Sequence, residues 1–147
     1  MGAMRVALLL CFLVCAATAG FLPFRKQRYA VRMKLKCGAK PASGVRVRLM
    51  EYDTGPDPDD EMDDGRTDNQ GYLRLEGSER ELSGIEPRLE IYHDCLDIEQ
   101  KTGIPKPCQR KWKIELPSSP YVNGPDFDMG IINLEMHLKD EDRDCIN

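Results

Sequence analysis

The sequence contains a single long apolar run among its 147 residues, and no second run follows it. This run begins at Val6, comes after one arginine, and closes on the small-residue pattern ATA at 17–19. Such a layout is typical of a secretory signal peptide, and the run is short for a membrane span of about 20 residues. We therefore predict a signal peptide over residues 1–19, a domain over residues 20–147, no transmembrane segment and an extracellular location.

Other absences narrow the function. No N-glycosylation sequon, phosphate-binding glycine loop, C-x-x-C pair or internal repeat occurs, and the only two histidines lie far apart in the sequence. There is no excess of positive charge, because 21 basic groups face 25 acidic groups and the net charge is −4. Non-specific nucleic-acid binding depends on neutralising phosphates with lysine and arginine, so this balance argues against a nucleic-acid partner.

The cysteines indicate disulfides. Two of the six cysteines fall in the predicted signal peptide, which leaves Cys37, Cys95, Cys108 and Cys145. An even number of cysteines in an exported chain predicts two disulfides, and three pairings are possible. We favour Cys95–Cys108, a short loop whose closure stabilises by roughly 3 kcal/mol, together with Cys37–Cys145. A zinc site is the weaker alternative, because the ligand spacing is wrong.

Apolar and polar residues alternate along most of the domain. In "YAVRMKLKC" at 29–37, the side chains of Tyr29, Val31, Met33 and Leu35 share one face. This period of two predicts half-buried strands. Further strands are predicted at 44–52, 72–76, 87–95, 110–116 and 129–139, with a weaker edge strand at 78–82. In the segment 129–139 the expected inward residues are Ile132, Leu134, Met136 and Leu138.

Helical periodicity is missing apart from room for one short helix at 96–101. Glycine- and proline-rich breaks separate the predicted strands, at 38–44, 83–84, 103–107 and 117–125. About seven short strands with turn signals between them predict an all-β fold, either a sandwich or a barrel.

Five segments, taken in order, resemble a known family. They are "LKCGAKPASGVRVRL", "DPDDEMDDGRTDNQGYLRLEG", "IYHDC", "PCQRKWKIELP" and "RDCIN", and they run from the first predicted strand to the last cysteine. In this order and spacing the chain is similar to the nematode transthyretin-like proteins. The resemblance implies a prealbumin-like sandwich of two antiparallel sheets with Greek-key connections, and an extracellular location. It implies no common biochemical activity.

Two relatives of that fold have activities that we do not transfer. Hydroxyisourate hydrolase is characterised by catalytic His and Arg residues and by a C-terminal Tyr-Arg-Gly-Ser motif, whereas this chain ends in "DRDCIN". Transthyretin itself binds hormone in a channel between subunits, and no matching channel residues can be identified here. Fold alone does not carry function.

The stretch "DTGPDPDDEMDDGRTDNQG" at 53–71 is the most acidic part of the chain. We interpret it as a solvated connector that ends in a return turn, with Gly71 adopting a positive φ. The alternative is an irregular calcium site, because calcium prefers clustered oxygen ligands. Its candidate ligands are Asp57, Asp59, Asp60, Asp63 and Asp64. An EF-hand is excluded, since the position that needs the second acid holds Met62.

Basic residues form rows on two predicted strands. The rows contain Arg32, Lys34 and Lys36 on the first strand and Arg46 and Arg48 on the second, and Arg110, Lys111 and Lys113 extend them. Their functional interpretation is attraction to an anionic lipid or glycan surface or to an acidic receptor. The structural interpretation is a solvated face with charges that guard sheet edges. In a transthyretin-type fold the two strands belong to different sheets.

The remaining candidates are aromatic residues and histidines. Alternation places His93 towards the core as a neutral, hydrogen-bonded residue without a nucleophile beside it, and His137 on the surface. Trp112 is expected in the core. Tyr121 lies in the proline-rich segment "PSSPYVNGP", either as an anchor for a partner or as a packed loop residue.

These observations predict a secreted, non-enzymatic binding or adaptor protein that engages an extracellular receptor or an anionic lipid or glycan surface. No cofactor is expected other than the calcium candidate, no catalytic residue is assigned, and the oligomeric state is left open. The alternatives are an enzyme of the hydroxyisourate hydrolase type and a carrier of a small apolar molecule.

Overall fold

The computed structural model describes residues 25–52, 59–81 and 84–146, and the predicted signal peptide lies outside these ranges. The described residues form nine strands and no helix, so the all-β prediction is confirmed and 96–101 is not helical. The strands are β1 (Arg25–Cys37), β2 (Lys40–Pro41), β3 (Arg46–Glu51), β4 (Asp60–Arg66), β5 (Tyr72–Glu81), β6 (Pro87–His93), β7 (Gln109–Glu115), β8 (Phe127–Asn133) and β9 (Asp142–Asp144). A search of the described segments for a helix able to span a bilayer finds none.

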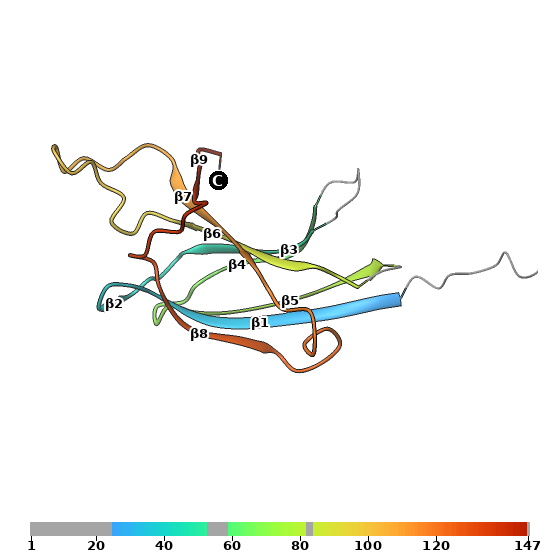
Figure 1. The fold of residues 1–147 in the computed structure, drawn as a ribbon. Helices are drawn as coiled ribbons and strands as arrows, with labels where there is room; N and C mark the ends of the chain where they lie inside the picture. Colours follow the sequence, from blue (N-terminus) through green and yellow to red (C-terminus); the bar gives the residue numbers. More distant parts are fainter. Residues whose placement is uncertain (1–24, 53–58, 82–83, 147) are drawn as a thin grey trace, which may run out of the picture.

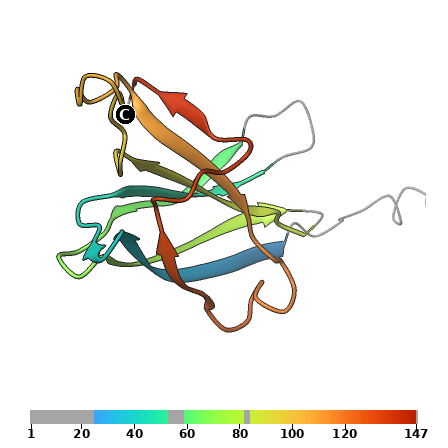
Figure 2. The ribbon, with the colours of Figure 1, turned by 60° about the vertical axis from the view of Figure 1, so that its left-hand side comes forward.

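The strands form two sheets that pack face to face (Figures 1 and 2). One sheet, called here the β1 sheet, has the order β2-β1-β5, with β8 also paired to β1. The other, the β3 sheet, has the order β4-β3-β6-β7-β9. β1 and β3 therefore lie in different layers, as the resemblance implied.

Pairing is antiparallel within both sheets, except that β8 runs parallel to β1. The parallel pairing aligns Lys34 with Ile131 and Arg32 with Asp128. On the other side of β1, the antiparallel pairing with β5 aligns Lys34 with Tyr72. The outer face of the β1 sheet therefore brings residues from three distant parts of the sequence into one row.

The core lies between the sheets and contains the residues that alternation placed inward. Tyr29, Val31, Met33 and Leu35 are all at most 2% exposed, and they pack in one cluster with the inward residues of β3, β6 and β7. Burial of aliphatic and aromatic surface is the main stabilising contribution to such a fold. The predicted return turn is also present, because Gly71 has φ +79° and Asp68 accepts the amides of Gln70 and Tyr72.

The favoured disulfide pairing is wrong. The structure pairs Cys37 with Cys95 and Cys108 with Cys145. The cause is strand pairing: β9 pairs with β7 so that Gln109 lies opposite Asp144, and the neighbouring cysteines meet with a Cα–Cα distance of 4.2 Å. Cys95, just after β6, reaches the end of β1 across the sandwich, where its Cα lies 5.7 Å from that of Cys37.

Three strand predictions also need correction. Part of the acidic connector is a strand, β4, although aspartate and glutamate are rare in strands. The predicted strand 72–76 and the weak edge strand 78–82 are one continuous strand, β5. The strand predicted over 129–139 ends at Asn133, so alternation stops there and Met136 is 49% exposed, while Leu134 remains buried as predicted.

Candidate functional site

The outer face of the β3 sheet carries a dense set of ion pairs. Arg46 binds Asp64 of β4, with a closest N–O distance of 2.5 Å. Arg48 binds Glu61 of β4 at 2.6 Å and Glu90 of β6 at 3.1 Å. The arginine row of β3 is thus neutralised by carboxylates of its own sheet, and this lowers its attraction for an external anion.

Glu90 is the centre of this ladder. Its carboxylate is buried and accepts hydrogen bonds from Lys111, Arg48 and the hydroxyl of Tyr92. Burial acts to raise the pKa of Glu90, but the bonds from Lys111 and Tyr92 outweigh it and hold the pKa below its ordinary value. On the same face, Arg46 holds the pKa of Asp64 below its ordinary value by hydrogen bonding.

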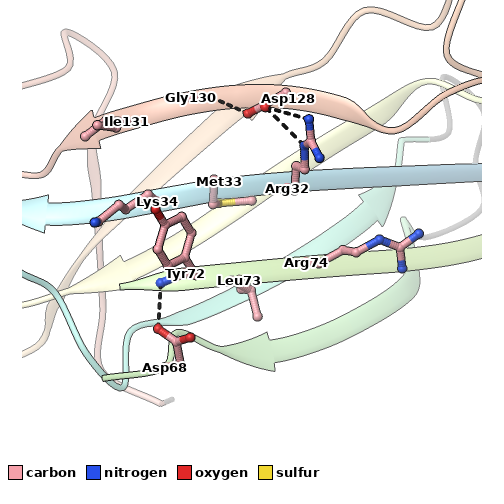
Figure 3. A pocket seen from close by; sticks show the side chains of 10 residues that line it. All are labelled: Arg32, Met33, Lys34, Asp68, Tyr72, Leu73, Arg74, Asp128, Gly130 and Ile131. Atoms are coloured by element: carbon pink, nitrogen blue, oxygen red, sulfur yellow. Dashed lines mark hydrogen bonds and ion pairs between the residues drawn. The ribbon is translucent and has the colours of Figure 1, made fainter. Parts of the chain in front are cut away.

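The outer face of the β1 sheet is different at the end where β1 meets β2. Figure 3 shows Lys34 in the middle of the sheet, between Tyr72 on β5 and Ile131 on β8. The ammonium of Lys34 lies 4.6 Å from the centroid of the Tyr72 ring, and no carboxylate within the described ranges pairs with it or with Lys36. Tyr72 is 53% exposed and Ile131 is 67% exposed.

Lys34, Tyr72 and Ile131 line an open groove of about 670 Å³. Its lining also includes the cations Arg32 and Arg74 and the apolar side chains of Met33 and Leu73. The groove is lined by Arg32, Met33, Lys34, Asp68, Tyr72, Leu73, Arg74, Asp128, Gly130 and Ile131. None of them is histidine, serine, threonine or cysteine, so the lining contains no Ser–His or Cys–His pair.

Further along the same face, two arginines are paired. Arg32 binds Asp128 at 2.9 Å, and Arg74 binds both Asp126, at 2.7 Å, and Glu76, at 2.6 Å. Hydrogen bonds from Arg28 and Arg74 lower the pKa of Glu76 to about 2. At the end of the sheet near β2, by contrast, the unpaired lysines Lys34 and Lys36 lie beside the exposed Tyr72 and Ile131. We call these four residues the lysine groove.

The five basic residues predicted to bind an anionic partner fall into two groups in the structure. Lys34 and Lys36 remain available, whereas Arg32, Arg46 and Arg48 are in ion pairs. Arg110, expected on a basic row, is buried in the core at 1% exposure. It binds Glu141 at 2.6 Å and donates to the carbonyls of Cys95 and Leu134, so it holds the C-terminal segment against β7.

The acidic candidates for calcium are not gathered around one point. Asp57 lies outside the described residues. Asp64 pairs with Arg46, and Asp63 accepts the amide of Glu76 across the sandwich edge. Asp59 and Asp60 are exposed. Within the described ranges no group of three or more His, Cys, Asp or Glu residues could hold a metal ion, so calcium binding stays a prediction that these ranges do not support.

The two histidines have separate environments. His93 is 2% exposed, accepts the amide of Cys95 at 3.3 Å and packs edge-on against Trp112. Burial, with the charge of Arg110 as a second cause, lowers its pKa to about 4, so it is neutral at pH 7. His137 is exposed. Both placements confirm the predictions.

The aromatic predictions are resolved as well. Trp112 is fully buried, and its indole N–H donates to Glu141. Tyr121 is half-buried and packs on Phe127 with ring centroids 4.7 Å apart, so its segment is a packed loop. Tyr72 and Ile131, which line the groove, were not singled out from the sequence. Alternation places Tyr72 on the outer side of its strand, but only the pairing of β5 and β8 with β1 brings them together.

The family model and the curated relatives that match this chain agree on one family. The model described as "Transthyretin-like family" matches residues 33–117. Transthyretin-like protein 46 of Caenorhabditis elegans is 43% identical over 126 residues, covering 83% of this chain and 68% of that protein. Transthyretin-like protein 2 of the same organism is 42% identical over 147 residues, covering 92% of this chain and 95% of that protein. A 9R-lipoxygenase from Cyanothece has a TM-score of only 0.46 at 16% identity, over 73% of this chain and 16% of that chain.

Proposed function

The chain belongs to the transthyretin-like family, and from that premise we propose that it is a secreted, non-enzymatic binding protein. Its ligand surface is the lysine groove on the outer face of the β1 sheet. The partner is an extracellular receptor that presents an acidic side chain next to an apolar one.

One observation carries the proposal. Lys34 lies over the ring of Tyr72, faces Ile131 across the strand pair, and has no carboxylate partner in the described part of the chain. The arginines of both outer faces that were described above, Arg32, Arg46, Arg48 and Arg74, are paired within the protein. An unpaired ammonium beside exposed aromatic and aliphatic carbon suits a group that joins an anion to an apolar body.

The two disulfides support the extracellular location, because disulfides form and persist in oxidising compartments. The groove supports binding over hydrolysis of the Ser–His or Cys–His type, because its lining contains no serine, cysteine or histidine. It also differs from the pocket of an apolar carrier, since it is open to solvent and five of its lining side chains are charged, namely Arg32, Lys34, Asp68, Arg74 and Asp128. No observation favours either alternative function.

The test is a surface plasmon resonance screen of purified receptor ectodomains, with heparin as the glycan probe and anionic vesicles as the lipid probe. A receptor that uses the groove should lose about tenfold in affinity on Lys34→Gln, because one desolvated charge contact is removed. Raising the salt concentration should weaken the same complex, since salt screens exposed charges.

Arg46→Gln is the matched control, because it also removes one cation from an outer sheet face but takes it from an existing ion pair. Receptor affinity should change less than twofold in this variant. Equal losses of receptor affinity in the two variants would refute the groove as the binding site. Receptor affinity that changes neither with salt nor with Lys34→Gln would refute it as well. If Lys34 mediated binding to heparin or to vesicles and no receptor bound, the proposed partner would be that glycan or lipid surface instead of a receptor.

A further inference from the structure

The chain contains five tyrosines, and their surroundings in the structure differ. Tyr29 and Tyr92 are buried, and the hydroxyl of each donates a hydrogen bond to an oxygen of the protein. Tyr121 packs against the core and against an aromatic neighbour. Tyr52 and Tyr72 remain at the surface, so they are the tyrosines whose hydroxyls can react with an external group.

Tyr52 directly follows β3 and has a fixed position. Its amide donates to the carbonyl of Glu86 at 3.0 Å, and the guanidinium of Arg88 lies 4.0 Å from the centroid of its ring. The attraction between this cation and the ring holds Tyr52 at a surface pocket of about 360 Å³ that it helps to line. Its hydroxyl makes no hydrogen bond with a described residue, so the oxygen is available for a reaction.

Acidic side chains lie around Tyr52 in space. Asp60 of β4 is exposed and lies opposite the last residue of β3, next to Tyr52. Glu86 and Glu115 are exposed and line the same pocket as the tyrosine. Arg88 is the cation in the lining of this pocket, and it is paired with Glu115 at 3.3 Å. Three carboxylates to one guanidinium give the phenol negative surroundings.

The sequence around Tyr52 has the same sign of charge. The stretch "EYDTGPDPDDE" at 51–61 contains six acidic residues, and no lysine or arginine occurs between Arg48 and Arg66. An enzyme that binds this stretch in an extended form therefore meets a tyrosine within a run of negative charge. Neither the fold nor the lysine groove accounts for such a run beside an accessible tyrosine.

We propose that Tyr52 is a site of tyrosine sulfation. Sulfotransferases in the lumen of the Golgi select accessible tyrosines with acidic neighbours, because positive charge in their acceptor sites attracts such segments. The proposal rests on the secretion proposed above, since only a chain that enters the secretory pathway meets these enzymes. It does not rest on the lysine groove, which lies on the other sheet.

The reaction is a transfer of a sulfuryl group without a change in oxidation state. The phenol oxygen of Tyr52 forms a bond to the sulfur of an activated sulfate, which is a mixed anhydride of sulfate with a nucleotide phosphate. The bond between that sulfur and the phosphate oxygen breaks, and its electron pair leaves with the phosphate. The phenol proton goes to a base of the sulfotransferase. The product is an aryl sulfate with a permanent negative charge at the end of β3.

Tyr72 is the matched comparison within the same chain. It is 53% exposed, so access to its ring is not limiting. Its surroundings are cationic, because the ammonium of Lys34 lies 4.6 Å from its ring centroid and Arg66 and Arg74 flank it in the sequence. If acidic surroundings select the tyrosine, Tyr52 is sulfated and Tyr72 is not.

Mass spectrometry of the full chain, expressed in cultured animal cells and recovered from the medium, tests the proposal. Trypsin releases the peptides 49–66 and 67–74, which contain Tyr52 and Tyr72 as their single tyrosines. We expect the mass of one SO₃ group on the first peptide, at an occupancy about tenfold or more above that of the second. Chlorate in the medium, which blocks the synthesis of activated sulfate, should remove the added mass, and phosphatase should leave it in place.

Three variants separate the phenol from its surroundings. Tyr52→Phe keeps the ring beside Arg88 and should carry no sulfate, whereas Tyr72→Phe is the matched control and should be sulfated like the wild type. Asp59→Asn/Asp60→Asn keeps the phenol but removes two exposed acids, and the occupancy should fall about threefold.

Three outcomes would overturn the proposal while leaving secretion and the receptor experiment in place. They are a secreted protein without sulfate on the peptide 49–66, equal occupancy of the two peptides, and an added mass that phosphatase removes. A chain that stays inside the cells and never reaches the medium would contradict the proposed secretion itself, and the sulfation of Tyr52 with it. The two failures are therefore distinguished by where the protein is recovered.

Discussion

The outer faces of the two sheets each carry a row of basic residues, but the side chains that the neighbouring strands place beside these rows are different. β1 and β3 both alternate basic and apolar residues, so each sheet presents a basic row to solvent. On the β3 sheet, Arg46 and Arg48 meet Asp64, Glu61 and Glu90 of neighbouring strands. On the β1 sheet, Lys34 meets Tyr72 and Ile131.

The difference shows that a basic row acquires its role from the adjacent strands. The acidic strand β4 is an example, because its position next to β3 turns a repulsive cluster of carboxylates into ion-pair partners for the arginines. Cross-strand neighbours are the unit in which sheet surfaces are stabilised. Arg46 and Arg48 of the β3 face are therefore paired, whereas Lys34 at the end of the β1 face is not.

Removing the centre of the β3 ladder should have the largest effect on stability. In Glu90→Gln, Lys111 and Arg48 lose a shared buried carboxylate. Leaving partly buried cations unpaired should cost about 3 kcal/mol in the free energy of unfolding. Urea unfolding at pH 7 measures it. Lys34→Gln on the other face should change the same free energy by less than about 0.5 kcal/mol, and a similar loss there would contradict the comparison.

As the pH decreases from 7, the first loss of stability should come from the buried His93 and not from the ion pairs of either outer face. The pKa of His93 is lowered from 6.5 to about 4, so the unfolded chain binds more protons between these values and stability falls as the pH decreases through that window. We expect a loss of about 2 kcal/mol between pH 7 and pH 5. The ion pairs of both faces involve Arg, Lys, Asp and Glu, whose ordinary pKa values lie outside the interval from pH 5 to pH 7.

His93→Asn isolates that contribution. The variant should be less stable than the wild type at pH 7, and its unfolding free energy should be nearly flat between pH 7 and pH 5. Chemical unfolding at closely spaced pH values measures both slopes. If the variant kept the wild-type slope, groups on the faces would be titrating instead.

The β3 face should become attractive to anions when its own carboxylates are neutralised. Glu61→Gln/Asp64→Asn removes partners of Arg48 and Arg46 and should raise heparin affinity about tenfold, measured as the salt concentration of elution. Asp59→Asn/Asp60→Asn makes the same change in net charge at two exposed acids. Equal gains in both variants would show that net charge, and not the release of the arginines, determines binding.

Much of the fold followed from alternation, because a period of two assigns each side chain to the core or to the surface. Tyr29, Val31, Trp112 and His93 were placed correctly on this basis. The same rule puts Arg110 on the side of Trp112, but its charge suggested the surface. Its burial depends on Glu141 and on carbonyls from a distant segment, and local patterning contains no signal for those contacts.

The site was less predictable for the same reason. Lys34 and Lys36 were candidates, but the sequence could not show that Arg46 and Arg48 are neutralised, because that needs the pairing of β3 with β4. The disulfides were mispaired because the partner of β9 was unknown. Register between distant strands is set by packing and by turn geometry.

The smallest expected effect on stability comes from giving Lys34 on the β1 face a carboxylate partner, as Arg46 and Arg48 already have on the β3 face. Ile131 lies opposite Lys34 in the parallel register, so Ile131→Glu places a carboxylate beside the unpaired ammonium. An exposed ion pair contributes little, and the free energy of unfolding should change by less than about 0.5 kcal/mol. Receptor affinity should nevertheless fall as much as in Lys34→Gln, because the anion site is now occupied from within. Ile131→Gln has similar size without the charge and should retain more of the affinity. If the two variants bound the receptor equally, the loss of affinity would come from the apolar surface of Ile131 and not from the availability of Lys34.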